Sequence, residues 1–286
     1  MAATINTNVS SLTAQRNLGM SQASLSTSIQ RLSSGLRINS AKDDAAGLAI
    51  ADRMNTQVRG MNVAVRNAGD AISMAQVAEG GLSTMNDMLQ RMRELAVQAS
   101  NATNSAGASG DIAKLKNEYD QLGKELGRML DATQFNGEKI LNTTASYVFQ
   151  VGANAGAENQ ITIANGDISL SGNAAFSAVA SGGASATLIT GTASANTANI
   201  AALDAAISAV NDRRASLGAL QSRFENTISY LRTASENQSA ARGRIMDADF
   251  AAETANLSRT QVLQQAGTAM IAQANQAPQQ VLALLR

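Results

Sequence analysis

The chain has 286 residues, 22 basic and 22 acidic side chains, and a hydrophobic content of 44% that includes only 3% aromatic residues and no tryptophan. Because histidine and cysteine are absent, disulfides, thiolate metal sites, cysteine nucleophiles and imidazole acid–base chemistry are excluded. The neutral net charge gives no electrostatic footprint for nucleic acid, and no run reaches the roughly 20 apolar residues of a membrane span, so we expect neither partner. A chain so poor in large aromatic side chains suits thin helical layers.

The N-terminal segment predicts an amphipathic helix. Its apolar residues recur at steps of three and four, apart from one phase slip, and they are Ile5, Val9, Leu12, Leu25, Ile29, Leu32 and Leu36. The pattern breaks over residues 38–44, where Ser40 or Asp43 can cap the next helix. The first ten residues lack a basic start and an apolar stretch, so we do not expect a cleavable secretory signal.

Two further helices are predicted before residue 130. Apolar steps of three or four continue over residues 50–100, across Gly80 and Gly81, which weaken the helix. Such a helix would be about 80 Å long and would need a partner helix alongside. A polar loop over residues 101–110 follows, and Asp111 is expected to cap the third helix.

The middle of the chain predicts short strands and a weakly packed segment. Asn136 and Gly137 indicate a turn, and the β-type runs at 147–151 and 161–163 predict a hairpin. Residues 171–198 are almost all Ala, Gly, Ser, Thr and Asn, which is typical of a low-complexity surface segment with little means to pack. Its hydroxyls could accept O-linked sugars, or the segment could simply be a polar loop.

Helix returns near residue 200. From there to Leu231, apolar residues repeat every 3.5 residues on average, with Arg214 and Gln221 at two positions of the repeat. Such a repeat predicts a neighbouring helix that covers it. After a predicted joint at residues 242–246, the last helix carries one more apolar stripe, which consists of Leu257, Leu263, Ala266, Met270, Ala274, Ala277, Val281 and Leu284.

The apolar stripes at the two ends predict an assembly surface. A thin helix pair cannot hide its apolar side chains, so we expect the ends of a free subunit to be partly disordered and to order against copies of itself. A contact between copies that does not close into a ring generates an open helical polymer. The predicted assembly residues are Ile5, Val9, Leu12, Leu25, Ile29, Leu32, Leu257, Leu263, Met270, Val281, Leu284 and Leu285. The same periodicity also fits an intramolecular bundle, and the pattern does not separate the two.

Several long motifs resemble those of bacterial flagellins. They are INTN at 5–8, LSSGLRINSAKDDAAGLAI at 32–50, LQRMRELAVQ at 89–98, QFNG at 134–137 and ANQAPQQVLALLR at 274–286. Long motifs in family order are more specific than a single short pattern. The chain departs from longer members in the middle, where an outer domain is absent or reduced to a loop.

The resemblance implies a mainly α fold, namely a long antiparallel helical bundle or coiled coil with a small β-hairpin region. Residues 1–43 and 243–286 would form the terminal coiled-coil layer called D0, and 44–170 with 199–242 would form the helical rod D1. Residues 171–198 would remain as a variable loop.

The resemblance also implies a function and partners. The chain would be a non-enzymatic structural subunit, without a cofactor, that self-assembles into the helical flagellar filament for motility. It would be secreted unfolded through the flagellar type III apparatus to the extracellular flagellum. Its partners would be other flagellin subunits, an export chaperone at the C-terminal segment, and the filament cap and hook-associated proteins.

A further partner implied by the resemblance is the vertebrate Toll-like receptor for flagellin. In the flagellins that it detects, an Arg and a Leu of a Gln-Arg-x-Arg-Glu-Leu stretch and a Glu of the next helix form the contact. They map onto Arg91, Leu95 and Glu118. Alternatively, Arg91 and Glu118 are solvated charges or filament contacts, and Leu95 packs.

Other functions share parts of this pattern. The hook–filament junction protein shares the terminal helices, and a cytoplasmic coiled-coil scaffold would share the periodicity. The close carboxylates Asp43 with Asp44 and Asp247 with Asp249 could serve acid–base chemistry or hold a cation, but helix capping explains them better. The zinc peptidase of some flagellins needs His-Glu-x-x-His, which a chain without histidine lacks.

Overall fold

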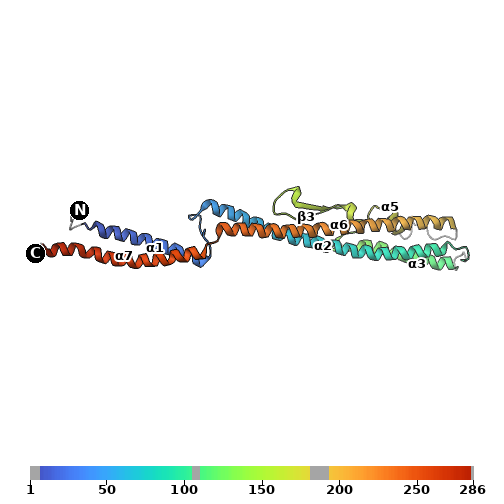
Figure 1. The fold of residues 1–286 in the computed structure, drawn as a ribbon. Coiled ribbons are helices and arrows are strands. Elements are labelled where there is room, and N and C mark those ends of the chain that lie inside the picture. The colour runs from blue at the N-terminus through green and yellow to red at the C-terminus, as the bar shows by residue number, and fades with distance from the viewer. Residues whose placement is uncertain (1–6, 105–109, 181–192, 285–286) are drawn as a thin grey trace. The chain divides into compact units, whose positions relative to one another are not determined.

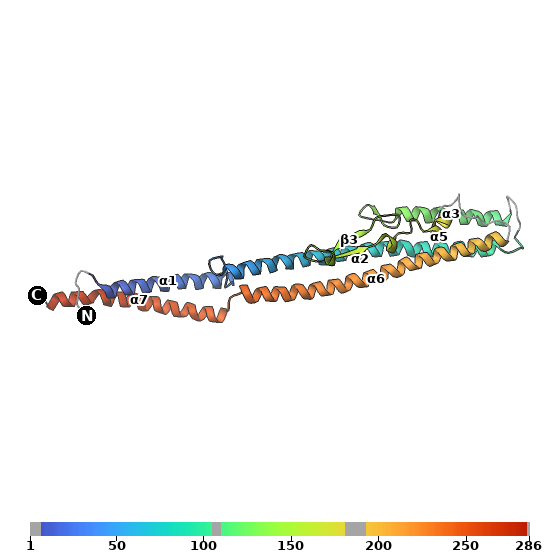
Figure 2. The same cartoon turned by 90° about the horizontal axis from the view of Figure 1, so that it is seen from above.

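The computed structural model describes residues 7–104, 110–180 and 193–284, and helices dominate it (Figures 1 and 2). The longer helices are α1 (Val9–Ser34), α2 (Ala45–Ala99), α3 (Asp111–Ala132), α6 (Ala193–Met246) and α7 (Phe250–Leu284). Two short helices, α4 (Asn165–Ile168) and α5 (Ala174–Ala180), lie between them in sequence. The predicted mainly α fold, with long antiparallel helices and a small β-hairpin region, is confirmed.

The chain forms two compact units, each of which we describe by itself. Unit 1 consists of Met1–Thr56 and Glu236–Arg286, and unit 2 consists of Gln57–Ser235. Over the three described ranges, no helix combines the length and the apolar character that crossing a membrane requires.

In unit 1, α1 and α7 lie side by side and antiparallel (Figures 1 and 2). The Asn8 side chain caps α1 by accepting a hydrogen bond from the Ser11 N–H at 3.1 Å. Gly35 ends α1 in the left-handed conformation, with φ of 71°, and its N–H donates to the Arg31 carbonyl. Both ends of α1 are therefore set by local sequence.

Carboxylates cap the two helices that follow breaks in unit 1. Asp44 accepts a hydrogen bond from the Gly47 N–H at 2.8 Å, so the prediction of Ser40 or Asp43 as the cap of α2 is wrong. Asp43 instead accepts from the N–H groups of Ser40 and Asn39, and these bonds lower the pKa of its carboxyl. Asp249 caps α7 by accepting from the N–H groups of residues 251 and 252. Capping thus accounts for Asp44 and Asp249.

The core of unit 2 is built between α2, α3 and α6, largely from alanine, leucine and methionine side chains. Alanines along α2 are fully buried, including Ala68, Ala71, Ala75 and Ala78. Farther along the same helix, Leu and Met fill the core, and these residues are Leu82, Met85, Leu89 and Met92. Phe224 of α6 meets Phe149 edge to face, with ring centroids 5.8 Å apart. Small side chains let the helices approach closely, as the aromatic-poor composition predicts.

Helix α2 continues through Gly80 and Gly81, and the structure gives Gly81 a packing role. A Cβ atom built on Gly81 would lie 2.9 Å from Oγ1 of Thr133 and 3.2 Å from Cδ1 of Leu141. A Cβ atom on Gly80 would meet nothing within 4 Å. Gly81 therefore leaves room for the segment that follows α3 to pack against α2, whereas Gly80 makes no such contact.

Helix α3 begins differently from the prediction. Gly110 occupies its N-cap position without a side-chain hydrogen bond, and Asp111 is the first helical residue. The prediction that Asp111 caps α3 is wrong, although a carboxylate in the first turn still suits the helix dipole.

Two antiparallel hairpins follow α3 in sequence. Strand β1 (Gln134–Phe135) pairs with β2 (Glu138–Lys139) around Asn136 and Gly137, whose φ values of 52° and 85° suit a tight two-residue turn. Strand β3 (Tyr147–Gln150) pairs with β4 (Gln160–Ile163), with Tyr147 opposite Ile163. Both the predicted turn and the predicted hairpin are confirmed.

Part of the segment predicted to have little means to pack is in the core. Helix α5 places Phe176 and Val179 among the buried side chains of unit 2. The prediction is therefore wrong for α5, because two large apolar residues three positions apart are enough to anchor one helical turn. Leu188 and Ile189, also in this segment, lie outside the described residues.

Candidate assembly surface

The predicted assembly residues of α1 and α7 are largely exposed in the single subunit. Val9, Leu12, Ile29, Leu263 and Met270 have between 49% and 63% of their surface accessible. Leu25, Leu32 and Leu257 are half-buried. Ile5 and Leu285 lie outside the described residues, and Val281 and Leu284 lie in α7 where side chains are not described. The described part of the predicted set thus includes five large apolar side chains open to solvent.

The side chains buried between α1 and α7 are polar. Ser11 and Ser28 of α1 and Glu253 and Thr260 of α7 are each at most 8% exposed. The Ser28 hydroxyl donates to Oε1 of Glu253 at 2.5 Å, and the Ser11 hydroxyl donates to Oδ1 of Asn275 at 2.8 Å. This order is the reverse of the usual one, in which apolar residues are inside and polar ones outside. Hydrogen bonds and the half-buried leucines therefore hold the pair from within, and the five exposed apolar side chains named above face outward.

A groove of about 570 Å³ lies between the exposed apolar residues of the two helices. Its walls include Val9 and Leu18 of α1 and Leu263 and Met270 of α7. Gly267 lines it as well, and a Cβ atom there would lie 3.2 Å from Cδ1 of Leu18. The remaining lining side chains are small, so the groove has the shape and chemistry to receive an apolar ridge of another helix.

Sequence reasoning missed Ser28 and Glu253, although a signal was present. Ser28 lies between Leu25 and Leu32 at steps of three and four, and Glu253 lies four residues before Leu257. Both therefore occupy positions of the apolar stripe, where a polar residue points to a specific interaction across the helix pair. The prediction considered only the apolar members of the stripe and therefore did not include these two polar residues.

Two of the three residues mapped to the immune-receptor contact lie together on the surface of unit 2. Arg91 of α2 binds Glu118 of α3 at 2.8 Å and Glu94 at 2.9 Å. The hydrogen bonds that Arg91 donates to the carboxylates of Glu94 and Glu118 raise the pKa of its guanidinium. Leu95 is fully buried in the core of unit 2. The structure thus brings Arg91 and Glu118 together but does not place Leu95 at the surface with them.

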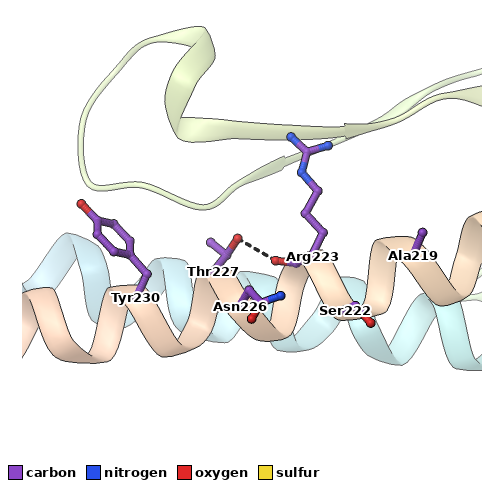
Figure 3. Close-up of a pocket in the computed structure, with 6 residues that line it drawn as sticks. All are labelled: Ala219, Ser222, Arg223, Asn226, Thr227 and Tyr230. Carbon is purple, nitrogen blue, oxygen red and sulfur yellow. Dashed lines mark hydrogen bonds between the residues drawn. The ribbon is translucent and has the colours of Figure 1, made fainter.

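A second hollow, of about 650 Å³, lies along α6 in unit 2 and is lined by Ala219, Ser222, Arg223, Asn226, Thr227 and Tyr230 (Figure 3). The Thr227 hydroxyl donates to the Arg223 carbonyl at 2.8 Å, and Tyr230 is largely exposed. This lining contains one cation and one phenol but no carboxylate, so it offers no acid–base pair. Across the described ranges, His, Cys, Asp and Glu form no group of three or more that could hold a metal ion.

Comparison with known proteins agrees with this arrangement of terminal helices. The bacterial flagellin N-terminal helical region matches residues 5–146, and the bacterial flagellin C-terminal helical region matches residues 200–285. A flagellin of Halalkalibacterium halodurans is 47% identical over 283 residues, which cover 99% of this chain and 99% of that protein. The flagellar filament 33 kDa core protein of Treponema phagedenis is 43% identical over 293 residues, with 99% of each chain covered.

Among solved structures, the crystal structure of Bacillus cereus flagellin is similar with a TM-score of 0.47 and 28% identity, over 62% of this chain and 94% of that one. Because both terminal helical regions match and a relative shares 47% identity along almost its whole length, this chain belongs to the bacterial flagellin family.

Proposed function

We propose that this chain is a structural subunit that polymerises with copies of itself into the helical filament of the bacterial flagellum, which serves motility. The observation that carries the proposal is the α1–α7 pair, whose fully buried side chains are polar and in which five large apolar side chains of the predicted set are exposed. The Treponema phagedenis relative is named as a flagellar filament core protein, which favours a filament subunit over the hook–filament junction protein and the cytoplasmic scaffold.

The exposed apolar side chains give polymerisation its driving force. Full burial of one Leu or Met side chain contributes about 1.5–3 kcal/mol. A side chain that is already half covered would contribute about 1 kcal/mol more when a neighbouring subunit covers the remainder. Different surfaces of identical subunits in contact generate a filament when the rotation between them does not close a ring.

Polymerisation of purified protein tests the proposal. The double substitution Leu12→Ser with Met270→Ser should raise the critical concentration for filament formation by about tenfold or more, since about 1.4 kcal/mol corresponds to tenfold. Sedimentation after seeding gives that concentration, and electron microscopy shows the filaments. Val148→Ser is the matched control, because Val148 and Leu12 are both 56% exposed but Val148 belongs to unit 2.

The result of each variant has a definite meaning. The control should polymerise as the parent chain does, and circular dichroism should show the same helix content in all three proteins. If the parent chain forms no filaments at any concentration when seeded, the proposed function is wrong. If the double variant polymerises like the parent, the α1–α7 pair is not the assembly surface.

The flagellar filament is extracellular, and we propose that this subunit is secreted there through the flagellar type III apparatus. An export chaperone would bind the C-terminal segment, where Val262, Leu263 and Met270 are exposed apolar residues of α7 that need shielding before assembly. The filament cap and the hook-associated proteins would contact the assembled subunits. The subunit's role is structural and non-enzymatic in this proposal. Loss of chaperone binding in Met270→Ser, measured by calorimetry, would support the shielding role.

We also propose that the Arg91–Glu118 pair contributes to contact with the Toll-like receptor for flagellin. Two charged groups on adjacent helices, half-exposed and held 2.8 Å apart, offer a preorganised polar contact of the kind that hot spots favour. Arg91→Ala should reduce signalling in a receptor reporter assay, whereas Arg128→Ala, which removes another ion pair of α3, should not. Leu95→Ala is unsuitable for this test, because it would open a cavity in the core.

A further inference from the structure

We propose that Ser28, Arg31 and Glu253 form a polar clasp that sets the register of α1 against α7, which makes Glu253 a positioning residue for filament assembly. The proposal rests on the proposed function, because register matters most if the two helices together present a surface to other subunits. It concerns unit 1 alone, and all three residues lie within the described part of the chain.

Both oxygens of the Glu253 carboxylate face α1. Oε1 accepts the hydrogen bond from the Ser28 hydroxyl at 2.5 Å, and Oε2 lies 3.7 Å from Nη1 of Arg31. The Glu253 side chain is only 11% exposed, and Ser28 is 4% exposed. Removing a carboxylate from water is costly unless it is paired and hydrogen-bonded. The observed register provides both partners at once.

The rest of the helix pair selects its register weakly. Leu18, Leu25 and Leu32 of α1 are half-buried, but because they repeat every seven residues, their apolar contacts distinguish poorly between alignments that differ by one heptad. At the far end of the pair, Asn8 donates to the carbonyl of Ala274 at 2.7 Å, and any residue of α7 could supply such a carbonyl. The Ser11 hydroxyl donates to Oδ1 of Asn275 at 2.8 Å, and seven residues earlier in α7 the hydroxyl of Thr268 could accept in its place. A slip by one heptad also keeps the spacing of the apolar stripe unchanged. Specificity must therefore come from side chains that cannot be replaced by their neighbours one heptad away.

Arg31 is such a side chain. Seven residues earlier along α1, Ser21 and Ser24 occupy the positions that correspond to Ser28 and Arg31. A pair slipped in that direction would offer Glu253 a hydroxyl but no cation. Seven residues later, the Ser28 position falls on Gly35, beyond the end of α1. The observed alignment is thus the one, among these three, in which the buried carboxylate keeps a hydrogen bond and an ion pair.

Engineered cysteines can report the register directly, because the natural chain contains none. A Cβ atom on Gly267 lies 3.7 Å from Cβ of Leu18, within the range of about 3.5–4.5 Å found in disulfides. Leu18→Cys with Gly267→Cys therefore reports the observed register. Leu18→Cys with Thr260→Cys reports a slip of one heptad. Non-reducing gels separate cross-links within a chain from those between chains, in dilute monomer and in seeded filaments.

The clasp is then removed in both reporter backgrounds. Glu253→Leu should lower the ratio of in-register to slipped cross-links by about tenfold and raise the critical concentration for filaments, although replacing a buried ion pair by an apolar side chain is often neutral or stabilising for folding. Glu253→Gln, which keeps an acceptor for Ser28 but loses the ion pair, should give an intermediate ratio. Ser28→Ala should lower the ratio, and the exposed Ser26→Ala should leave it unchanged.

The failures of the two proposals are distinguishable. An unchanged cross-link ratio and unchanged assembly in Glu253→Leu would overturn the clasp, and so would a clasp-containing parent that cross-links equally in both reporters. If the parent forms no filaments but its dilute monomer still shows the Glu253-dependent ratio, the clasp stands and the proposed function fails. A fall in the ratio without any change in helix content would support a positioning role rather than a general loss of fold.

Discussion

Replacing Gly81 with Ala tests whether the structure places the segment after α3 correctly against α2. In an isolated helix this change would stabilise by about 1 kcal/mol, because glycine is a poor helix former. In the folded unit, however, the added Cβ would lie 2.9 Å from Oγ1 and 3.1 Å from Cγ2 of Thr133 and 3.2 Å from Cδ1 of Leu141. The first distance is too short for a real Cβ contact, so something must move.

Neither neighbour of Gly81 is free to move. The Thr133 hydroxyl donates to the Met129 carbonyl at 2.8 Å, and the Thr133 carbonyl accepts from the Ile140 N–H at 3.1 Å. Leu141 is fully buried, and its carbonyl accepts from the Leu170 N–H at 3.0 Å. Overpacking of this kind costs about 1–3 kcal/mol. After the gain in helix propensity, we expect Gly81→Ala to destabilise unit 2 by about 0–2 kcal/mol.

Gly80→Ala is the matched control, because nothing lies within 4 Å of its added Cβ. It should stabilise by about 1 kcal/mol, so the two variants should differ by about 1–3 kcal/mol in free energy of unfolding. Urea unfolding of the monomer, followed by circular dichroism, measures the difference. Equal stabilisation of both variants would show that Gly81 is not covered by Thr133 and Leu141, and would refute the packing described for this part of unit 2.

Three other predictions follow from buried groups. Tyr119 is 3% exposed, and burial raises the pKa of its phenol to about 12; since the unfolded chain ionises first, near pH 10, the stabilisation is complete below pH 10 and falls by roughly 3 kcal/mol as pH rises toward 12. Urea titrations of Tyr119→Phe should lack that part of the alkaline loss, and an identical pH profile would contradict the assignment. A Cβ on Gly47 would lie 2.8 Å from Cδ1 of the buried Ile38 and 2.5 Å from Oδ2 of Asp44, so Gly47→Ala should displace the cap of α2 and speed amide exchange in its first turn by about fivefold, the equivalent of about 1 kcal/mol. Phe224→Ala should lower the free energy of unfolding by about 3–5 kcal/mol, and a loss below about 1 kcal/mol in urea would show that this fully buried ring is not part of the core.

Sequence periodicity located the long helices well but not their ends. The apolar steps predicted α2, α3, α6 and α7, since a repeat of three and four residues places side chains on one helical face whatever the partner is. The cap of α2 was assigned to Ser40 or Asp43, whereas Asp44 makes the bond. A sequence pattern does not distinguish two adjacent carboxylates. Only the path of the backbone decides which one faces the free N–H groups of the helix.

Composition misled the prediction for the segment around α5. A stretch of Ala, Gly, Ser and Thr indicates weak packing on average, but Phe176 and Val179 are in the core of unit 2. Burial depends on what lies opposite a residue, and that is settled by contacts distant in sequence. In the same way, the resemblance placed Arg91, Leu95 and Glu118 in one patch, and the structure pairs Arg91 with Glu118 while burying Leu95.

The sequence by itself determined that the chain is mainly helical, that it resembles flagellins, and that both ends carry apolar stripes, because these properties are local or are written in the order of residues. Only the tertiary structure decided which side of those stripes faces inward. In unit 1 the helices meet along Ser28 and Glu253 rather than along Leu12 and Met270. A helix has a buried face only where a second helix packs against it, so the sequence pattern alone could not determine which residues are buried.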